Sequence, residues 1–98
     1  MGIFELNKVK DKYSLFVITG RQNGVTFNLS FDKLMTTMTP DVVSLKGGQG
    51  DVSFYSIRRV VLKQRDEDTT EIYLFREGDT KETVRITAVK RTPNAATA

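Results

Sequence analysis

The chain of 98 residues contains no cysteine, no histidine and no tryptophan. Without cysteine it has no disulfide, no thiolate nucleophile and no cysteine-ligated zinc or iron–sulfur site. Without histidine it lacks the commonest general base near neutral pH, the Ser-His-Asp and Cys-His triads, and every histidine-ligated metal centre. We therefore expect a protein that is not an enzyme and that holds no metal and no cofactor.

Long apolar segments are also missing. No apolar run exceeds the four residues found at 15–18, whereas a membrane-spanning helix needs about 20. The first residues include the acidic Glu5 and lack the apolar region of a secretory signal. The sequence therefore predicts a cytoplasmic protein for which a membrane is an unlikely partner.

The overall composition is that of a small globular protein, with 39% hydrophobic and 28% charged residues. This length predicts a single domain, which we assign to residues 1–90. Residues 91–98 lack core-forming side chains, so we expect a flexible C-terminal tail. The 15 basic and 12 acidic residues give a net charge of +3, but the two signs are interspersed and form no basic stripe.

Most of the chain has the pattern of β-strands. Residues 13–19 are β-branched and aromatic, the dipeptide Asn23-Gly24 is a strong turn signal, and residues 25–31 alternate between apolar and polar side chains. Further strand patterns follow at 42–46, 52–55, 57–64, 71–76 and 82–89. We expect an all-β protein, a small antiparallel barrel or sandwich of about six to seven strands, with at most one short helix near 31–38.

The alternating pattern also predicts which side chains form the core. The predicted core residues are Leu15, Val17, Phe27, Leu29, Leu62, Val84 and Ile86. The first twelve residues carry apolar side chains, enough for a strand or a single turn that docks on the core. Residues 42–46 are short and end in a lysine, which suits a strand at a sheet edge. If the chain forms a homo-oligomer, we expect one of these two segments at the interface.

One candidate binding face combines aromatic and basic residues on neighbouring strands. Its members are Arg59, Lys63, Tyr73, Phe75 and Arg85. Aromatic rings among basic groups on a sheet face are what modules that bind single-stranded nucleic acid use for base stacking and phosphate contact. In the alternative interpretation Tyr73 and Phe75 lie in the core, or both faces of the sheet are covered, because apolar strand faces are usually packing surfaces.

Two loops also resemble ligand sites. Residues 66–68 form an Asp-Glu-Asp cluster, but the spacing does not fit a calcium-binding loop, and a solvated turn explains it better. Residues 47–50 read Gly-Gly-Gln-Gly, but no Gly-Lys-Ser/Thr follows, so a mobile turn is the better interpretation than a phosphate loop.

Residues 42–76 resemble small bacterial pleckstrin-homology-like domains. The likeness lies in a strand, a glycine turn, the short strand Val52-Ser53-Phe54-Tyr55, the segment 56–60 that opens a long strand, and the strand 71–76. The end of the chain departs from that family because it lacks an amphipathic helix. An SH3-like or Sm-like barrel is the other option, and such barrels bind peptides, lipids or nucleic acids.

These observations favour a non-enzymatic binding module that contacts another protein, such as an accessory or inhibitor protein of a phage or mobile element. The first alternative is nucleic-acid or nucleotide binding through the basic and aromatic face. The second is binding to anionic lipids, which the pleckstrin-like pattern implies.

Overall fold

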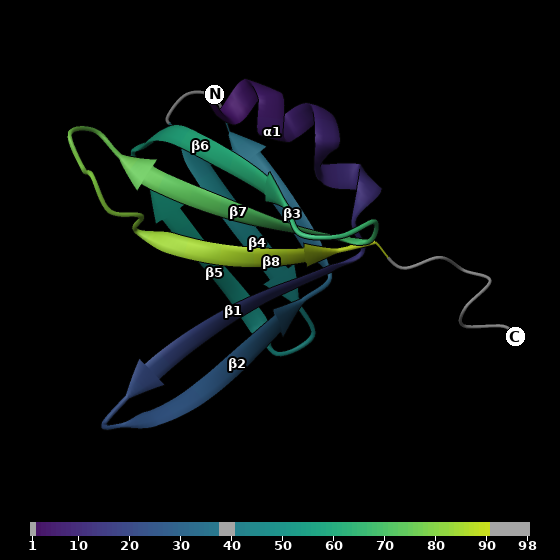
Figure 1. Cartoon of the computed structure of the whole chain (residues 1–98), viewed down its shortest axis with the longest axis vertical. Coiled ribbons are helices and arrows are strands. Elements are labelled where there is room, and N and C mark those ends of the chain that lie inside the picture. The colour runs from purple at the N-terminus through teal and green to yellow at the C-terminus, as the bar shows by residue number, and fades with distance from the viewer. Residues whose placement is uncertain (1, 38–40, 91–98) are drawn as a thin grey trace, which may run out of the picture.

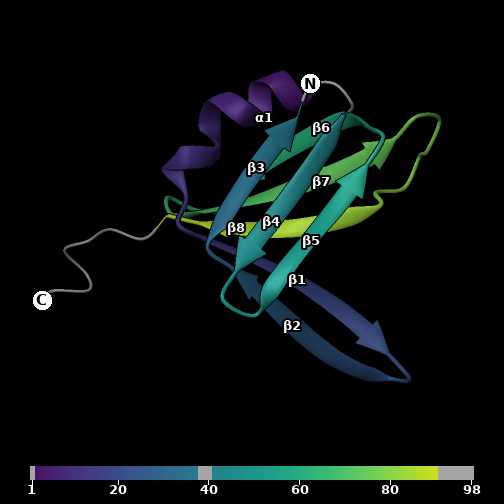
Figure 2. The ribbon, with the colours of Figure 1, turned by 180° about the vertical axis from the view of Figure 1, so that it is seen from behind.

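Two antiparallel β-sheets make up most of the computed structural model, which describes residues 2–37 and 41–90 (Figures 1 and 2). The five-stranded sheet has the order β2-β1-β8-β7-β6, and the three-stranded sheet has the order β3-β4-β5. The strands are β1 Leu15–Gln22, β2 Val25–Phe31, β3 Lys33–Thr37, β4 Val42–Gly47, β5 Gly50–Tyr55, β6 Ile57–Gln64, β7 Thr69–Arg76 and β8 Val84–Val89. The all-β class is confirmed, with eight strands in the described residues instead of six to seven.

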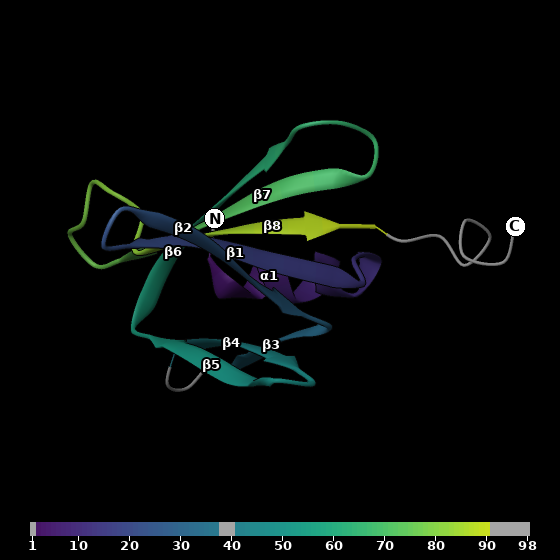
Figure 3. The same ribbon diagram turned by 90° about the horizontal axis from the view of Figure 1, so that it is seen from below.

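The two sheets form separate layers that the chain joins at two sharp corners (Figure 3). At the first corner, between β2 and β3, the Asp32 N–H donates to the carbonyl of Lys46 at 2.8 Å. At the second, between β5 and β6, Ser56 has a φ of 60°, the left-handed region that reverses the direction of a strand. Asp41 holds this corner, since its carbonyl accepts the N–H of Ile57 at 3.1 Å and its carboxylate pairs with Arg58 at 3.0 Å. The two sheets therefore face each other across one core.

The core lies between the sheets and draws on both of them. Its buried members are Ile3, Leu6, Phe16, Phe31, Leu34, Val43, Leu45, Ile57, Val60, Ile72, Leu74, Ile86 and Ala88. Of the predicted core residues, Ile86 is buried and Leu62 and Val84 pack against the cluster.

The other core predictions are wrong. Because side chains alternate along β1, the burial of Phe16 directs Leu15 and Val17 to the opposite face of the sheet, where they are half-buried. Phe27 and Leu29 point to the core side of their sheet but remain 39% and 43% exposed. The reason is that the hairpin of β1 and β2 extends past the second sheet (Figure 1), so the strand leaves the space between the two layers toward the hairpin tip, and residues 25–30 stay exposed.

Helix α1, Ile3–Val9, covers one open side of the sandwich and continues into the 3-10 turn Lys10–Lys12. Ile3 and Leu6 lie one turn apart and are both buried, so they share the face that enters the core. The Glu5 carboxylate accepts the Gly2 N–H at 2.7 Å, which satisfies one free donor at the helix start. The helix contacts β3 and β6, which are edge strands of the two sheets. Docking of the first twelve residues is confirmed, in the form of a helix.

The predicted helix near 31–38 is wrong. Residues Lys33–Thr37 form β3, which pairs with β4, while residue 38 lies outside the described range. The β-branched Thr36 and Thr37 lose side-chain freedom in a helix and favour an extended strand. Within β3 only Leu34 is fully buried, which suits a strand with one face on the core.

The predicted edge position of residues 42–46 is also wrong. These residues belong to β4, which pairs with β3 on one side and with β5 on the other. Val42, Val43 and Leu45 are accordingly buried. The strand predicted at 13–19 is confirmed from Leu15 onward, where β1 lies between β2 and β8. The predicted tail at 91–98 lies outside the described residues.

Candidate functional site

The predicted aromatic residues lie on the outer face of the five-stranded sheet. In β7, Ile72 and Leu74 are fully buried in the core, so Tyr73 and Phe75 point away from it. The alternative in which Tyr73 and Phe75 lie in the core is therefore wrong, whereas the alternative in which both faces of the sheet are covered holds at Phe75 and Glu71, which are buried on the outer face. Phe75 is nevertheless only 8% exposed, because neighbouring side chains on the outer face cover its ring.

Two arginines stack on these rings across the strands. The guanidinium carbon Cζ of Arg59 lies 4.0 Å from the centre of the Phe75 ring, and that of Arg85 lies 5.3 Å from the centre of the Tyr73 ring. Each pair is directly opposite in the sheet register, on β6 and β7 or on β7 and β8. Both distances are within the range of cation–π attraction. The rings therefore hold two positive groups in fixed positions on the outer face.

The buried carboxylate of Glu71 contacts both members of the Tyr73–Arg85 pair. Glu71 is 9% exposed and accepts a hydrogen bond from the Tyr73 hydroxyl at 3.2 Å. Its two oxygens also lie 3.8 Å from Arg65 Nε and 3.7 Å from an Arg85 Nη atom. Lys63 is directly opposite Glu71 on β6. A nearly buried charge of this kind is tolerated because several donors surround it.

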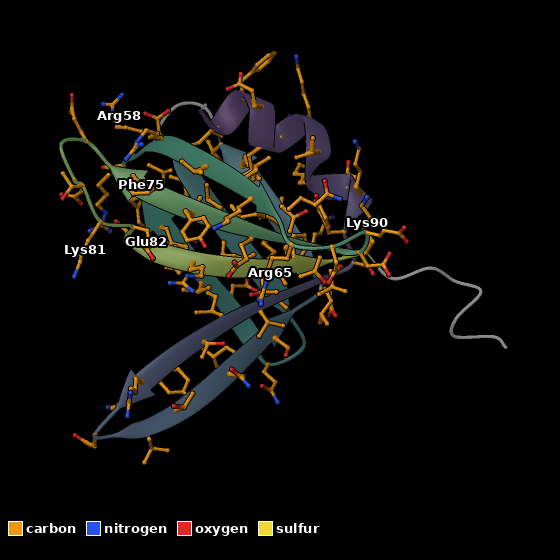
Figure 4. All side chains as sticks on the ribbon, in the orientation of Figure 1. Arg58, Arg65, Phe75, Lys81, Glu82 and Lys90 are labelled. Atoms are coloured by element: carbon orange, nitrogen blue, oxygen red, sulfur yellow. The ribbon has the colours of Figure 1, made fainter. Side chains whose placement is uncertain are left out.

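The outer face has a hollow that Glu71 and Arg85 help to line. The hollow has a volume of about 680 Å³, and its lining includes Arg65, Glu71, Glu82, Thr87 and Arg85. The pKa of Glu82 is lowered, first because its own backbone N–H donates to the carboxylate and then because Arg85 donates to it as well. Figure 4 looks onto this face, with Arg65 above β8 and with Phe75 and Glu82 toward the opposite end of the sheet.

The structure thus brings all five predicted site residues to one face: Arg59, Lys63, Tyr73, Phe75 and Arg85. Sequence reasoning missed the participation of Glu71, although its spacing of two from Tyr73 places both on the same side of a strand. The strand pattern also does not place Arg65 on this face, because the position of its side chain depends on the turn that follows it. The binding role of this face stays a prediction.

A second candidate surface is the outer edge of β2. Two residues of this strand, Phe27 and Leu29, were predicted to lie in the core. In the described part of the chain β2 pairs with β1 alone, so one side of its backbone has no partner strand. Val25, Phe27 and Leu29 are 66%, 39% and 43% exposed and lie on one face of this strand. No residue of Val25–Phe31 is charged.

The sheet edges at β6 and β3 are protected in ways that β2 is not. β6 carries Arg58, Arg59 and Lys63 and has an irregular register near its start. β3 contacts helix α1, with the Thr36 hydroxyl donating to Asn7 at 2.7 Å. Charges, bulges and covering segments are the means by which proteins keep strand edges from pairing with other chains.

Next to the β2 edge lies a small groove of about 220 Å³. It is lined by Leu29, Ser30, Phe31, Gln49, Gly50, Asp51 and Val52. One wall therefore comes from the end of β2 and the other from the turn between β4 and β5 and the start of β5. Its lining is mainly apolar, with Asp51 as the charged residue at the rim.

The two loops with ligand-like sequences are turns. Asp66 Oδ1 accepts the backbone N–H groups of Asp68 and Thr69, each at 2.9 Å, which closes the turn between β6 and β7. The bond from Asp68 is the first reason why the pKa of Asp66 is lowered. Gly47 and Gly50 are paired across the turn between β4 and β5. Among residues 2–37 and 41–90 no group of three or more acidic side chains is arranged to hold a metal.

Comparison with protein-family models, with characterised proteins and with solved structures found no match. The resemblance to pleckstrin-homology-like domains therefore stays a prediction. In the part of the chain that the structure describes, neither length nor hydropathy would let a helix cross a membrane.

Proposed function

We propose that the chain is a protein-binding module that takes up an extended segment of a partner protein along the free edge of β2. The observation that carries the proposal is that β2 is uncharged and unprotected and presents Val25, Phe27 and Leu29 to solvent. An exposed edge of this kind pairs readily with another strand, and proteins normally avoid it unless it is used.

The turn at the tip of the hairpin determines which backbone groups are free. Asn23 and Gly24 both have positive φ values, 53° and 79°, as the two central residues of a type I′ turn do. In such a turn the residue that begins the second strand donates its N–H back to the first strand. Because hydrogen bonding alternates along an antiparallel pair, the N–H groups of Thr26, Asn28 and Ser30 point to the free edge.

The free backbone groups and the apolar side chains of β2 indicate what kind of segment can bind there. Main-chain hydrogen bonds to these free groups supply affinity for any extended backbone, whereas side-chain pockets supply specificity. Phe27 and Leu29 offer an apolar face, and the groove formed with Val52 adjoins it. We therefore expect an uncharged partner strand with alternating apolar side chains. A second copy of this chain meets the same requirements, since its own β2 has this pattern.

Two substitutions at one position test the proposal. Thr26→Pro removes an edge-facing N–H without breaking a bond to β1, whereas Thr26→Ala shortens the same side chain and keeps the N–H. Tagged protein is expressed in its own organism, and recovered partners are identified and quantified by mass spectrometry. We expect one defined partner with the parent chain and with Thr26→Ala, and at least about tenfold less with Thr26→Pro.

Light scattering on the same samples tests self-association. If the partner is a second copy of this chain, we expect the parent and Thr26→Ala to be dimers and Thr26→Pro to be a monomer. Equal retention of the partner by the two variants would contradict the proposal. So would a parent chain that is monomeric and captures nothing reproducibly.

A catalytic role is not part of the proposal, which agrees with the lack of histidine and cysteine in the sequence. We further propose a cytoplasmic location and a role as an accessory or inhibitor protein of a phage or mobile element.

A further inference from the structure

We infer that the outer face of β6, β7 and β8 binds single-stranded nucleic acid, with the two arginine–aromatic stacks holding unpaired bases. This site is separate from the β2 edge and does not depend on the function proposed for it. Three features of the face indicate this class of ligand. They are the flat guanidinium groups of two arginines, the spacing of the two arginine–aromatic pairs along β7, and the local charge.

The flat surfaces are the guanidinium groups of Arg59 and Arg85. The Cζ atom of Arg59 lies over the Phe75 ring, 4.0 Å from its centre, and that of Arg85 lies over the Tyr73 ring, 5.3 Å from its centre. Arg59 is an exposed residue and the Arg85 side chain is 55% exposed, so both guanidinium groups keep surface that a ligand can reach. Bases of single strands stack on aromatic rings and on arginine planes alike. Because the rings already hold these arginines, a ligand orders fewer side chains when it binds.

The spacing of the stacks suits bases that are not paired in a duplex. Phe75 and Tyr73 are two residues apart on β7, which corresponds to about 6.6 Å along the strand. Stacked bases of a double helix are about 3.4 Å apart on each strand. The two positions would therefore hold two bases that are separated from each other, as in recognition of single-stranded loops and ends.

The charge of the face matches a phosphate backbone. Arg59, Lys63, Arg65 and Arg85 project from this surface, while its carboxylates are Glu71 and Glu82. Glu71 is nearly buried beneath its hydrogen-bond and ion-pair partners, so the exposed part of the face is predominantly positive. The hollow lined by Arg65 and Arg85 lies beside the second stack and gives the backbone a path across β8.

Fluorescence anisotropy with labelled oligonucleotides of about 12 nucleotides tests this inference, using oligo(U), oligo(dT) and a duplex of the same length. The variant is Arg59→Gln combined with Arg85→Gln. The control is Lys46→Gln, which removes one positive charge from the exposed side of β4 on the other sheet. Thermal unfolding followed by circular dichroism confirms that each variant is folded before binding is compared.

We expect the parent chain to bind single strands more tightly than the duplex. We expect the double variant to lose at least about tenfold in affinity, and Lys46→Gln less than about threefold. Release of counterions from about three phosphates predicts that the logarithm of affinity falls with the logarithm of salt concentration with a slope of about −2. A difference between oligo(U) and oligo(dT) assigns the ligand to RNA or DNA.

Four results would overturn the inference. These are no binding at about 50 mM salt, equal binding of duplex and single strand, an undiminished affinity of the double variant, and competition by polyglutamate as strong as by unlabelled oligonucleotide. The last result would assign the face to acidic peptides, because a ligand without bases would then be sufficient.

Discussion

The aromatic ring of Phe27 lies directly against Gly20, its cross-strand partner on β1. A β-carbon built at Gly20 would overlap this ring, with the Phe27 Cε2 atom only 2.8 Å away. An aromatic ring over a glycine shields backbone that would otherwise be exposed, and it partly offsets the low strand propensity of glycine. This contact stabilises the hairpin in the region where it extends past the second sheet.

The contact makes the effect of Gly20→Ala depend on residue 27. In the parent chain we expect Gly20→Ala to destabilise by about 1 kcal/mol, because the ring must move away. In a Phe27→Ala background it should stabilise by about 0.5–1 kcal/mol, since alanine is the better strand residue. Phe27→Ala alone should cost about 1–2 kcal/mol, less than a buried phenylalanine. Urea unfolding of the four chains measures the coupling, and additive effects would show that ring and glycine do not interact.

Helix α1 provides a matched pair of substitutions. Leu6 is fully buried between the sheets, whereas Phe4 is 53% exposed, with Lys8 lying 4.4 Å from the centre of its ring. We expect Leu6→Ala to lower the free energy of unfolding by about 2–5 kcal/mol and Phe4→Ala by less than about 1 kcal/mol. Chemical denaturation checks both values. Similar losses for the two variants would mean that the helix does not dock through the face described.

The turn between β6 and β7 should contribute to pH dependence through Asp66. Backbone N–H bonds favour its ionised form, so its pKa in the folded chain is below the ordinary 3.8. A lowered pKa stabilises the fold at pH values above the unfolded pKa, and this contribution is lost as the pH falls through the folded value. A carbon-detected NMR titration should place the Asp66 midpoint below 3.8, and Asp66→Asn should weaken the pH dependence of unfolding in the acid range. A midpoint at or above 3.8 would show that the turn is open in solution.

Sequence patterns predicted the local structure more reliably than the positions of the layers. The Asn23-Gly24 turn and the alternation of β7 both follow from local chemistry, so they were predictable. The exposure of Phe27 was not, because alternation identifies the apolar face of a strand but not whether another sheet lies above it. The short helix predicted near 31–38 is wrong because Leu34 and Met35 fit a helix or a strand equally well, and the pairing of Lys33–Thr37 with β4 decided the outcome.

Part of the candidate face could also be predicted from local sequence patterns. Cross-strand neighbours such as Tyr73 and Arg85 follow from strand register, which the turns largely determine. The edge of β2 was missed, because the strand order of a sheet depends on long-range pairing that local sequence does not encode.

Amide hydrogen exchange on β2, in the complex recovered with the protein-binding partner, tests whether this edge is the binding surface. The N–H groups of Thr26, Asn28 and Ser30 should exchange rapidly in the free chain and at least about tenfold more slowly in the complex. Those of β5, one of the two edge strands of the other sheet, should exchange at similar rates in both samples. Unchanged exchange at the three β2 amides, with protection appearing elsewhere, would contradict strand addition at β2.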